Sequence, residues 1–541
     1  MEKQNKILEK SEKRTIIKRI KNINKETIAI ILILIIGFSV RLFQIDKMPN
    51  ALNVDEASAG YEAYSILHYG IDRNGNFMPV FLKAWGSGQN VLLTYLMIPF
   101  IQILGLGELA IRLPMAIVGC ISLIIFYKLL KKTTNKKIAI IGIAFLAICP
   151  WHILKSRWAL ESNLLPDIIL WAVYLFVLSI EKKKTLYYYT SFAVAGLAAY
   201  AYGTSYFFLP CFLIPLVIVG VKKKWITVKQ AILGVAITGI ISLPIILYVI
   251  INTLNLPQIN LPFMTIPRLE VNRYQEITSI FSSEFIRQSI ENFKQSICYI
   301  FIKQYDELPW NAIKPYGIIY SFSIIFTIIG LVELFRKKKT LEIKYQAIWK
   351  IWFIVSIIMT IVCEPNINRL NIMMFPIIFM TVIGIQKVIC NKKEIGIAFA
   401  ILYGILFTCF LIDYSMQDCN TYWTFESNLE EPMKELKELE PDHQIYITND
   451  IKESYIYTLF YTKYDTREFV KTVKYERPDV AFRGVLGFGN YHFQEIKEEE
   501  IEGKKENVYL VKNGSIDINK LDTEKFNIKE FEGFTLIEGK E

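Results

Sequence analysis

Long uncharged apolar runs are the feature of this sequence that most restricts its fold. A helix that crosses the hydrocarbon core of a membrane needs about 20 mainly apolar residues, and such runs recur between residues 27 and 412. The run 185–221 carries no charge and would measure about 55 Å as one helix, too long for a core of about 30 Å. We therefore divide it into two spans at Gly203–Ser205. The pattern predicts a polytopic α-helical membrane protein.

Eleven spans are expected from these runs, near residues 27–45, 110–130, 138–154, 162–180, 185–203, 206–221, 230–251, 315–335, 346–363, 370–389 and 395–412. The first run follows nine Lys and Arg residues and has no small-residue cleavage site behind it, which indicates an anchor helix. The short stretch 90–105 contains Pro99, and we place it as a helix that lies on the outer surface.

The basic loops set the expected orientation. Lys and Arg gather on the cytoplasmic side of membrane proteins, and the clusters here are the N-terminus, Lys131–Lys137, Lys182–Lys184, Lys222–Lys224, Arg336–Lys339 and Lys387–Lys393. This predicts three parts, which are a cytoplasmic N-terminus (1–26), a transmembrane domain (27–412) with outer loops 46–109 and 252–314, and an extracytoplasmic tail (413–541).

The tail differs from the rest of the chain in charge and in pattern. It holds 17 basic and 28 acidic residues, whereas residues 1–412 hold 44 basic and 23 acidic residues. Short β-like stretches at Gln444–Thr448, Asn507–Val511 and Phe534–Glu538, with a helical stretch around 452–464, predict a small α/β domain. The positive charge of the body marks cytoplasmic loops, so no nucleic-acid partner is expected.

Eight scattered cysteines form no CxxC pair. Disulfide frameworks and zinc ribbons are therefore not expected, and we interpret all eight as small buried apolar residues.

Two adjacent carboxylates, Asp55 and Glu56, follow the first span directly. A carboxylate at a membrane surface can act as a general base, and a second one can orient a substrate or bind a cation. The alternative is structural, because Asp55 could cap the helix that follows.

Basic residues on the outer side are a second signal. Arg41, Arg112, Arg157 and Arg369 stand at predicted outer ends of spans, together with Glu161 and Glu364, and Lys83 lies in the first loop. Arginine binds phosphate well because its planar fork donates two hydrogen bonds. Helix-end ion pairs or snorkelling explain any single arginine equally well.

Two further residues at outer ends are weaker candidates. His152 could contact a donor phosphate or form a helix-end hydrogen bond, and Tyr202 could stack on a sugar or belong to an interfacial aromatic belt.

The order of motifs resembles glycosyltransferase family 39, the relatives of protein O-mannosyltransferases and of the lipid A aminoarabinose transferase. The resemblance rests on Asp55-Glu56, on 75–79 (Gly-Asn-Phe-Met-Pro), on the surface helix, and on 107–114 (Gly-Glu-Leu-Ala-Ile-Arg-Leu-Pro). The stretches 150–152 and 156–161 also fit, whereas 83–90 departs from the His-Pro-Pro-Leu-like pattern of many members.

This resemblance implies a GT-C fold with about 11 transmembrane helices and an inverting transfer from a polyprenyl-phosphate sugar, a hexose or a pentose. Asp55 would be the general base, with Glu56 beside it. Lys83, Arg112, Arg157 and Arg369 would bind the donor phosphate, and Glu161, His152 and Tyr202 would contact substrate. The acceptor would be a lipid, a polymer or a protein. No metal ligands are assigned, and a divalent cation stays an open alternative.

Two other classes of function fit the sequence less well. A secondary transporter or flippase would place ionisable residues near the bilayer midplane, whereas this chain keeps them at the outer ends of the spans. An assembly protein that recruits a partner through its tail would not need eleven spans.

The Ile-, Lys- and Asn-rich usage favours a bacterial plasma membrane and an undecaprenyl carrier.

Overall fold

A computed structural model describes most of the chain, namely residues 24–84, 88–271, 278–279, 283–337, 340–390, 392–419, 424–478, 480 and 483–540. The basic N-terminus lies outside the described residues up to residue 23, and so do residues 85–87 of the first loop.

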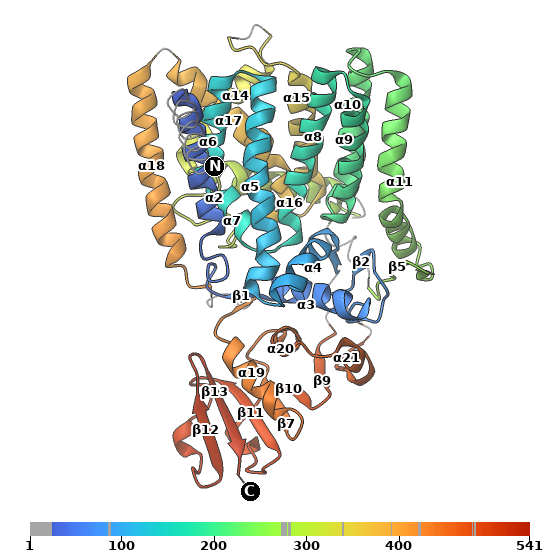
Figure 1. Cartoon of the computed structure of the whole chain (residues 1–541), viewed down its shortest axis with the longest axis vertical. Coiled ribbons are helices and arrows are strands. Elements are labelled where there is room, and N and C mark those ends of the chain that lie inside the picture. Colours follow the sequence, from blue (N-terminus) through green and yellow to red (C-terminus); the bar gives the residue numbers. More distant parts are fainter. Residues whose placement is uncertain are drawn as a thin grey trace, which may run out of the picture.

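The body of the protein is a bundle of roughly parallel helices, and the tail hangs from one end of it (Figure 1). The bundle helices are α2 (Lys25–Leu42), α5 (Glu108–Thr133), α6 (Lys136–Ile148), α7 (Pro150–Arg157), α8 (Leu165–Lys182), α9 (Thr185–Leu197), α10 (Ser205–Lys222), α11 (Val228–Thr253), α14 (Ile324–Phe335), α15 (Gln346–Val362), α17 (Met374–Ile389) and α18 (Lys393–Ser415).

Within the described residues, six helical segments are long and apolar enough to cross a membrane, so this is a multi-pass membrane protein. They are Glu108–Thr133, Glu161–Lys182, Ser205–Lys222, Val228–Thr253, Ile367–Ile389 and Lys393–Ser415. A seventh arises if α6 and α7 form one span, which bends by 54° where Pro150 begins α7. Helices α2, α9, α14 and α15 are shorter or carry more charge, and the expected count of eleven therefore stays a prediction.

Small residues let two bundle helices approach each other closely. A Cβ atom at Gly330 of α14 would lie 1.8 Å from the carbonyl oxygen of Met380, and one at Gly384 of α17 would lie 1.9 Å from that of Phe326. The hydroxyls of Thr327 and Thr381 are 2.7 Å apart across the same interface. This is the small-residue packing with polar contacts that stabilises helix pairs in lipid.

The first loop folds at the end of the bundle that faces the tail (Figure 1). It contains β1 (Leu52–Asn53), α3 (Val54–Tyr69), a hairpin of β2 (Phe81–Leu82) and β3 (Gln89–Asn90), and α4 (Leu92–Leu104). Helix α4 has 13 residues, about 20 Å, and is too short to cross the membrane. The expectation that 90–105 does not span agrees with this length.

The segment expected to form the second outer loop begins after α11. Its hairpin pairs β4 (Ile259–Leu261) with β5 (Met264–Ile266), and α13 (Phe285–Ile297) follows. The short helix α16 (Ile367–Leu370) leads into α17.

The tail folds around a seven-stranded mixed sheet in the order β12-β13-β11-β7-β10-β9-β8. Its elements are β6 (Phe425–Glu426), α19 (Glu430–Leu439), β7 (Gln444–Thr448), α20 (Ser454–Thr462), α21 (Thr466–Thr472), β8 (Lys474–Tyr475), β9 (Val485–Phe488), β10 (Tyr491–Gln494), β11 (Asn507–Lys512), β12 (Phe526–Glu530) and β13 (Phe534–Gly539). Strands β7, β11 and β13 and helix α20 match the stretches expected from sequence.

The tail is joined to the first loop by a strand pair. Strand β1 pairs antiparallel with β6, with Leu52 opposite Glu426 and Asn53 opposite Phe425. The Tyr61 hydroxyl of α3 also donates to the carbonyl oxygen of Tyr464 at 2.9 Å. The tail and the first loop therefore lie at the same end of the bundle.

Candidate functional site

Helix α3 begins with a capping box that places Asp55 and Glu56 in its first turn. The Asn53 side chain accepts a hydrogen bond from the Asp55 backbone N–H at 2.8 Å, and Glu56 accepts one from the Asn53 N–H at 3.3 Å. Asn53 therefore fills the N-cap role that the sequence offered to Asp55. The Asp55 side chain remains available to face the loop opposite.

Glu56 points into the protein. Its carboxylate accepts two hydrogen bonds from the Arg112 guanidinium, at 3.0 and 2.9 Å, and one from the backbone N–H of Ala159 at 2.7 Å. Glu56 and Arg112 are both fully buried. The pair fixes α3 against α5 and against the segment that carries Glu161.

Asp55 faces the β2–β3 hairpin instead. The Gln89 side-chain amide lies 3.4 Å from the Asp55 carboxylate, and Glu161 interacts electrostatically with Asp55. Glu161 accepts a hydrogen bond from the backbone N–H of Asn90, the neighbour of Gln89. Asn90 donates in turn to the Tyr206 hydroxyl at 2.8 Å. Two carboxylates and two amides are thus brought together from three distant segments.

Arg369 and Tyr202 form a further polar contact near Glu161. The Tyr202 hydroxyl interacts with the Arg369 guanidinium and with Glu161. Arg369 is held by Glu364, whose carboxylate is 2.7 Å away, and its side chain is 21% exposed. Arg369 therefore keeps a part-exposed guanidinium that a ligand can reach.

The other outer arginines are engaged within the protein. Arg112 donates to the backbone carbonyl oxygens of Ile45, Pro49 and Ala51 in addition to Glu56. Arg157 donates to those of Val40, Phe43, Gln44 and Met48. Both guanidinium groups hold the chain where it leaves α2.

His152 is also fully buried. Its Nδ1 atom lies 2.7 Å from an Arg41 guanidinium nitrogen, and its Nε2 atom lies 3.8 Å from Asp167. Because Nδ1 faces a permanent cation, it acts as an acceptor. In this structure His152 is part of an interior network with Arg41, Lys155 and Asp167.

Lys83 leaves the β2–β3 hairpin on the side that faces the tail. Its ammonium nitrogen lies 3.0 Å from the carboxylate of Glu270 in the second outer segment. Neither Glu270 nor the hairpin residues Gln89 and Asn90 were singled out from sequence. The departure from the family pattern at 83–90 was the available signal for the hairpin.

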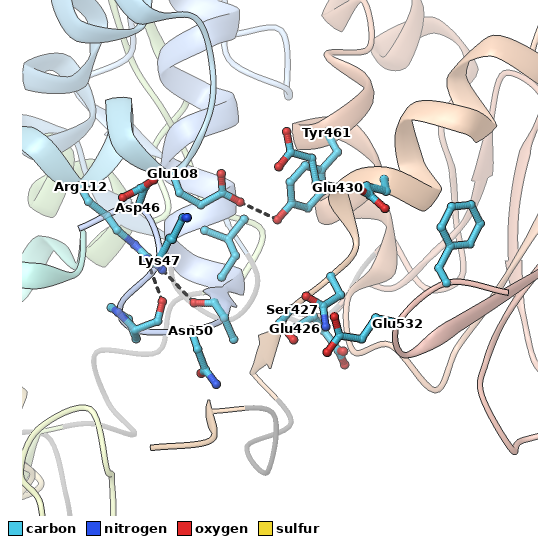
Figure 2. A pocket seen from close by; sticks show the side chains of 16 residues that line it. Asp46, Lys47, Asn50, Glu108, Arg112, Glu426, Ser427, Glu430, Tyr461 and Glu532 are labelled. Atoms are coloured by element: carbon cyan, nitrogen blue, oxygen red, sulfur yellow. Dashed lines mark hydrogen bonds between the residues drawn. The ribbon is translucent and has the colours of Figure 1, made fainter. Parts of the chain in front are cut away.

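A polar pocket of about 440 Å³ lies between the first loop and the tail (Figure 2). Six carboxylates line it, from Asp46, Glu108, Glu426, Glu430, Glu431 and Glu532. Glu108 accepts a hydrogen bond from the Tyr461 hydroxyl at 2.7 Å. Arg112 contributes to the wall, but Asp55 does not line this pocket.

No group of three or more His, Cys, Asp or Glu side chains within the described part of the chain is arranged to hold a metal ion.

Residues 89–248 match the family model described as dolichyl-phosphate-mannose-protein mannosyltransferase. The resemblance to glycosyltransferase family 39 is confirmed.

One solved structure similar to the chain over nearly its whole length is ArnT from Cupriavidus metallidurans bound to undecaprenyl phosphate. The TM-score is 0.52 at 9% sequence identity, and the match covers 94% of this chain and 97% of that one. At this identity the likeness shows the fold.

Two further matches are weaker. The oligosaccharyltransferase from Archaeoglobus fulgidus matches with a TM-score of 0.49 and 13% identity over 80% of this chain, which spans 61% of that protein. The Pmt1–Pmt2 protein O-mannosyltransferase complex from S. cerevisiae, bound to its sugar donor, matches 43% of this chain and 34% of its own, with a TM-score of 0.32 and 16% identity. No curated protein matches the sequence.

Proposed function

We propose that this protein is an inverting membrane glycosyltransferase that moves a sugar from a polyprenyl-phosphate-linked donor to an acceptor hydroxyl. The family match supports a transferase, and ArnT, the similar structure of nearly equal length, binds undecaprenyl phosphate. In this proposal residues 27–412 form the catalytic membrane domain, and the first loop and the tail face the outside of the plasma membrane. The comparisons do not favour the transporter or flippase.

The observation that carries the proposal is the setting of Asp55. It stands in the first turn of a helix fixed by Asn53 and Glu56, beside Gln89 and Glu161. The acceptor hydroxyl attacks the anomeric carbon as the bond from that carbon to the phosphate oxygen breaks. Asp55 takes the hydroxyl proton, and the polyprenyl phosphate leaves with the bonding electrons.

The charges around Asp55 fit this reaction. A phosphate ester leaves as an anion without a proton, so cations rather than a general acid are needed beside it. Of the four cations expected to bind the donor phosphate, Arg369 and Lys83 have part-exposed side chains, and each is held by one carboxylate. We assign Glu161 and Tyr202 to the substrate and Glu56, Arg112 and Arg157 to positioning. His152 in this view supports the bundle.

The test is a transfer assay with the full chain in detergent or nanodiscs, using labelled polyprenyl-phosphate hexoses and pentoses and a membrane extract as acceptor. Asp55→Asn should lower transfer by about 10²- to 10⁴-fold, the usual contribution of a general base, while donor binding persists. Glu307→Gln, an exposed carboxylate of another outer loop, is the matched control. Full transfer by Asp55→Asn would exclude the assigned base.

A further inference from the structure

A single carboxylate bridges two cations that come from different parts of the chain. Glu270, just beyond β5, lies 3.0 Å from the Lys83 ammonium of the first loop and 3.9 Å from the Arg483 guanidinium of the tail. All three side chains are part-exposed, at 14% for Lys83, 21% for Arg483 and 39% for Glu270. The two outer loops and the tail therefore meet at one ionic cluster.

The Arg483 side chain and the Lys83 backbone are held in place by contacts that do not involve Glu270. Arg483 donates to the Asn74 side-chain oxygen at 3.1 Å, and its guanidinium lies 4.7 Å from the ring centre of Tyr475. Asn74 itself donates to the backbone carbonyl oxygen of Lys83 at 3.1 Å. Removing Glu270 would therefore leave the Lys83 backbone and the Arg483 side chain where they are.

The recess around these cations favours an anion. Three basic side chains line it, those of Arg73, Lys83 and Arg483, and Glu453 is the one carboxylate among its described lining residues. Arg73 already has a buried partner in Glu62, 3.3 Å away. The free volume of the recess is about 20 Å³, and Glu270 contacts two of its basic side chains without lining it.

Glu270 is the residue of this cluster whose carboxylate another anion can replace. It is the most exposed of the three side chains, and part-exposed ion pairs of this kind contribute little to stability. Although burial acts to raise the pKa of Glu270, Lys83 and Arg483 hold it below its usual value, so the carboxylate is ionised at neutral pH. A phosphate group offers the same pair of oxygens to the two cations and carries more charge.

We propose that Lys83 and Arg483 form a binding site for the phosphate of a polyprenyl phosphate lipid, and that Glu270 occupies this site until the lipid phosphate displaces it. The inference rests on the proposed function and extends it, because it gives the tail a donor-binding residue. Lys83 connects the site to the proposed base. It follows Leu82, whose strand partner Gln89 contacts Asp55.

The test measures binding without catalysis, with the full chain in nanodiscs and three probes, which are undecaprenyl phosphate, undecaprenol and inorganic phosphate. Glu270→Gln should bind undecaprenyl phosphate at least threefold more tightly than the natural chain. Arg483→Met should bind it about tenfold more weakly, and Arg483→Lys should recover part of the loss. Arg467→Met removes an exposed tail arginine that pairs with Asp465, and it should change nothing.

The outcomes separate this site from the proposed function. Unchanged affinity in both Glu270→Gln and Arg483→Met would overturn the site, even if Asp55→Asn abolishes transfer. Equal affinity for undecaprenol and undecaprenyl phosphate would overturn it as well. Inorganic phosphate that binds as tightly as the lipid would show a site for free phosphate and contradict the lipid assignment. Thermal unfolding of each variant identifies a loss of affinity that comes from misfolding, and in that case the Glu270→Gln result decides.

Discussion

The hydroxyl of Tyr457, on helix α20 of the tail, donates a hydrogen bond to the backbone carbonyl oxygen of Leu52 at 3.1 Å. Leu52 stands three residues before Asp55, in the strand that pairs with β6. The backbone N–H of Val54 donates to the carbonyl oxygen of Thr424 at 2.9 Å. The tail therefore fixes the segment that leads into the helix of the proposed base.

Tyr457→Phe removes this hydrogen bond, which the hydroxyl shares with the carbonyl oxygen of Thr424 at 3.2 Å, and leaves the ring in place. We expect transfer to fall several-fold through kcat, with the donor KM unchanged, because the entry to α3 becomes less well fixed. One hydrogen bond contributes about 0.5–1.5 kcal/mol, so the protein should still fold. Steady-state transfer kinetics measure the effect. Tyr446→Phe, on strand β7 of the tail sheet, is the control, and equal kcat values in the two variants would contradict the positioning role.

The same contacts predict the effect of removing the tail. A chain that ends near residue 416 loses β6 and the Tyr457 hydroxyl, so strand β1 has no partner. We expect this truncation to abolish transfer even if no tail residue touches substrate. Loss of activity on truncation therefore cannot by itself assign substrate recognition to the tail. Full activity of the truncated chain would show that the first loop holds its shape without β6.

The buried pair of Glu56 and Arg112 makes a prediction about stability. Glu56→Gln or Arg112→Met alone leaves one buried charge without its partner, and we expect a loss of about 3–5 kcal/mol. The double variant Glu56→Gln/Arg112→Met should lose less than the sum of the two single losses, because both charges are gone. Thermal or denaturant unfolding of the purified protein in detergent gives the three values. Additive losses would show that the two side chains do not act as a pair.

Much of the fold follows from local patterns in the sequence. The length of the apolar runs predicted the bundle helices, and the alternation in residues 444–448, 507–511 and 534–538 predicted three strands of the tail sheet. Both patterns involve residues that are close together in the sequence. The pairing of β1 with β6 joins residues more than 370 positions apart, and no local pattern reports such a pair.

The site was harder to predict from the sequence than the fold was, and the reason is physical. Arg157 and Arg369 both stand at outer helix ends, but one faces backbone carbonyl oxygens and the other faces solvent and Glu364. The same residue type at the same kind of position serves two purposes, and the difference lies in the path of the neighbouring loop. Glu270 and Arg483 were not predicted from the sequence because the proposed role of each depends on Lys83, which lies in a different segment of the chain.

Arg369 gives a prediction about donor affinity. Arg369→Met should raise the donor KM about tenfold, the order expected when one charge-assisted contact of about 1.4 kcal/mol is lost. Arg369→Lys should recover part of it, because the charge is kept while the planar fork is lost. Arg287→Met, an exposed arginine of the second outer segment, is the control. An unchanged donor KM in Arg369→Met would remove this residue from the donor site.

Glu62, two turns along α3 from Asp55, predicts how stability depends on pH. Burial raises the pKa of Glu62 to about 8, whereas nearby Arg73 lowers it and Asp72 raises it further. Tyr455 and Tyr475 of the tail face Arg73 from the other side. Between about pH 5 and pH 8 the unfolded chain releases this proton while the folded chain retains it. Stability should therefore fall as the pH rises through this range.

Glu62→Gln tests this assignment, because the amide resembles the protonated acid and has no proton to release. The unfolding temperature of the natural chain should fall more steeply between pH 5 and pH 8 than that of Glu62→Gln, and the two should agree best near pH 5. Glu468→Gln, an exposed carboxylate on α21, should keep the slope of the natural chain. If Glu62→Gln keeps it too, another group sets the pH dependence, and Glu62 is ionised in the folded protein through its contact with Arg73.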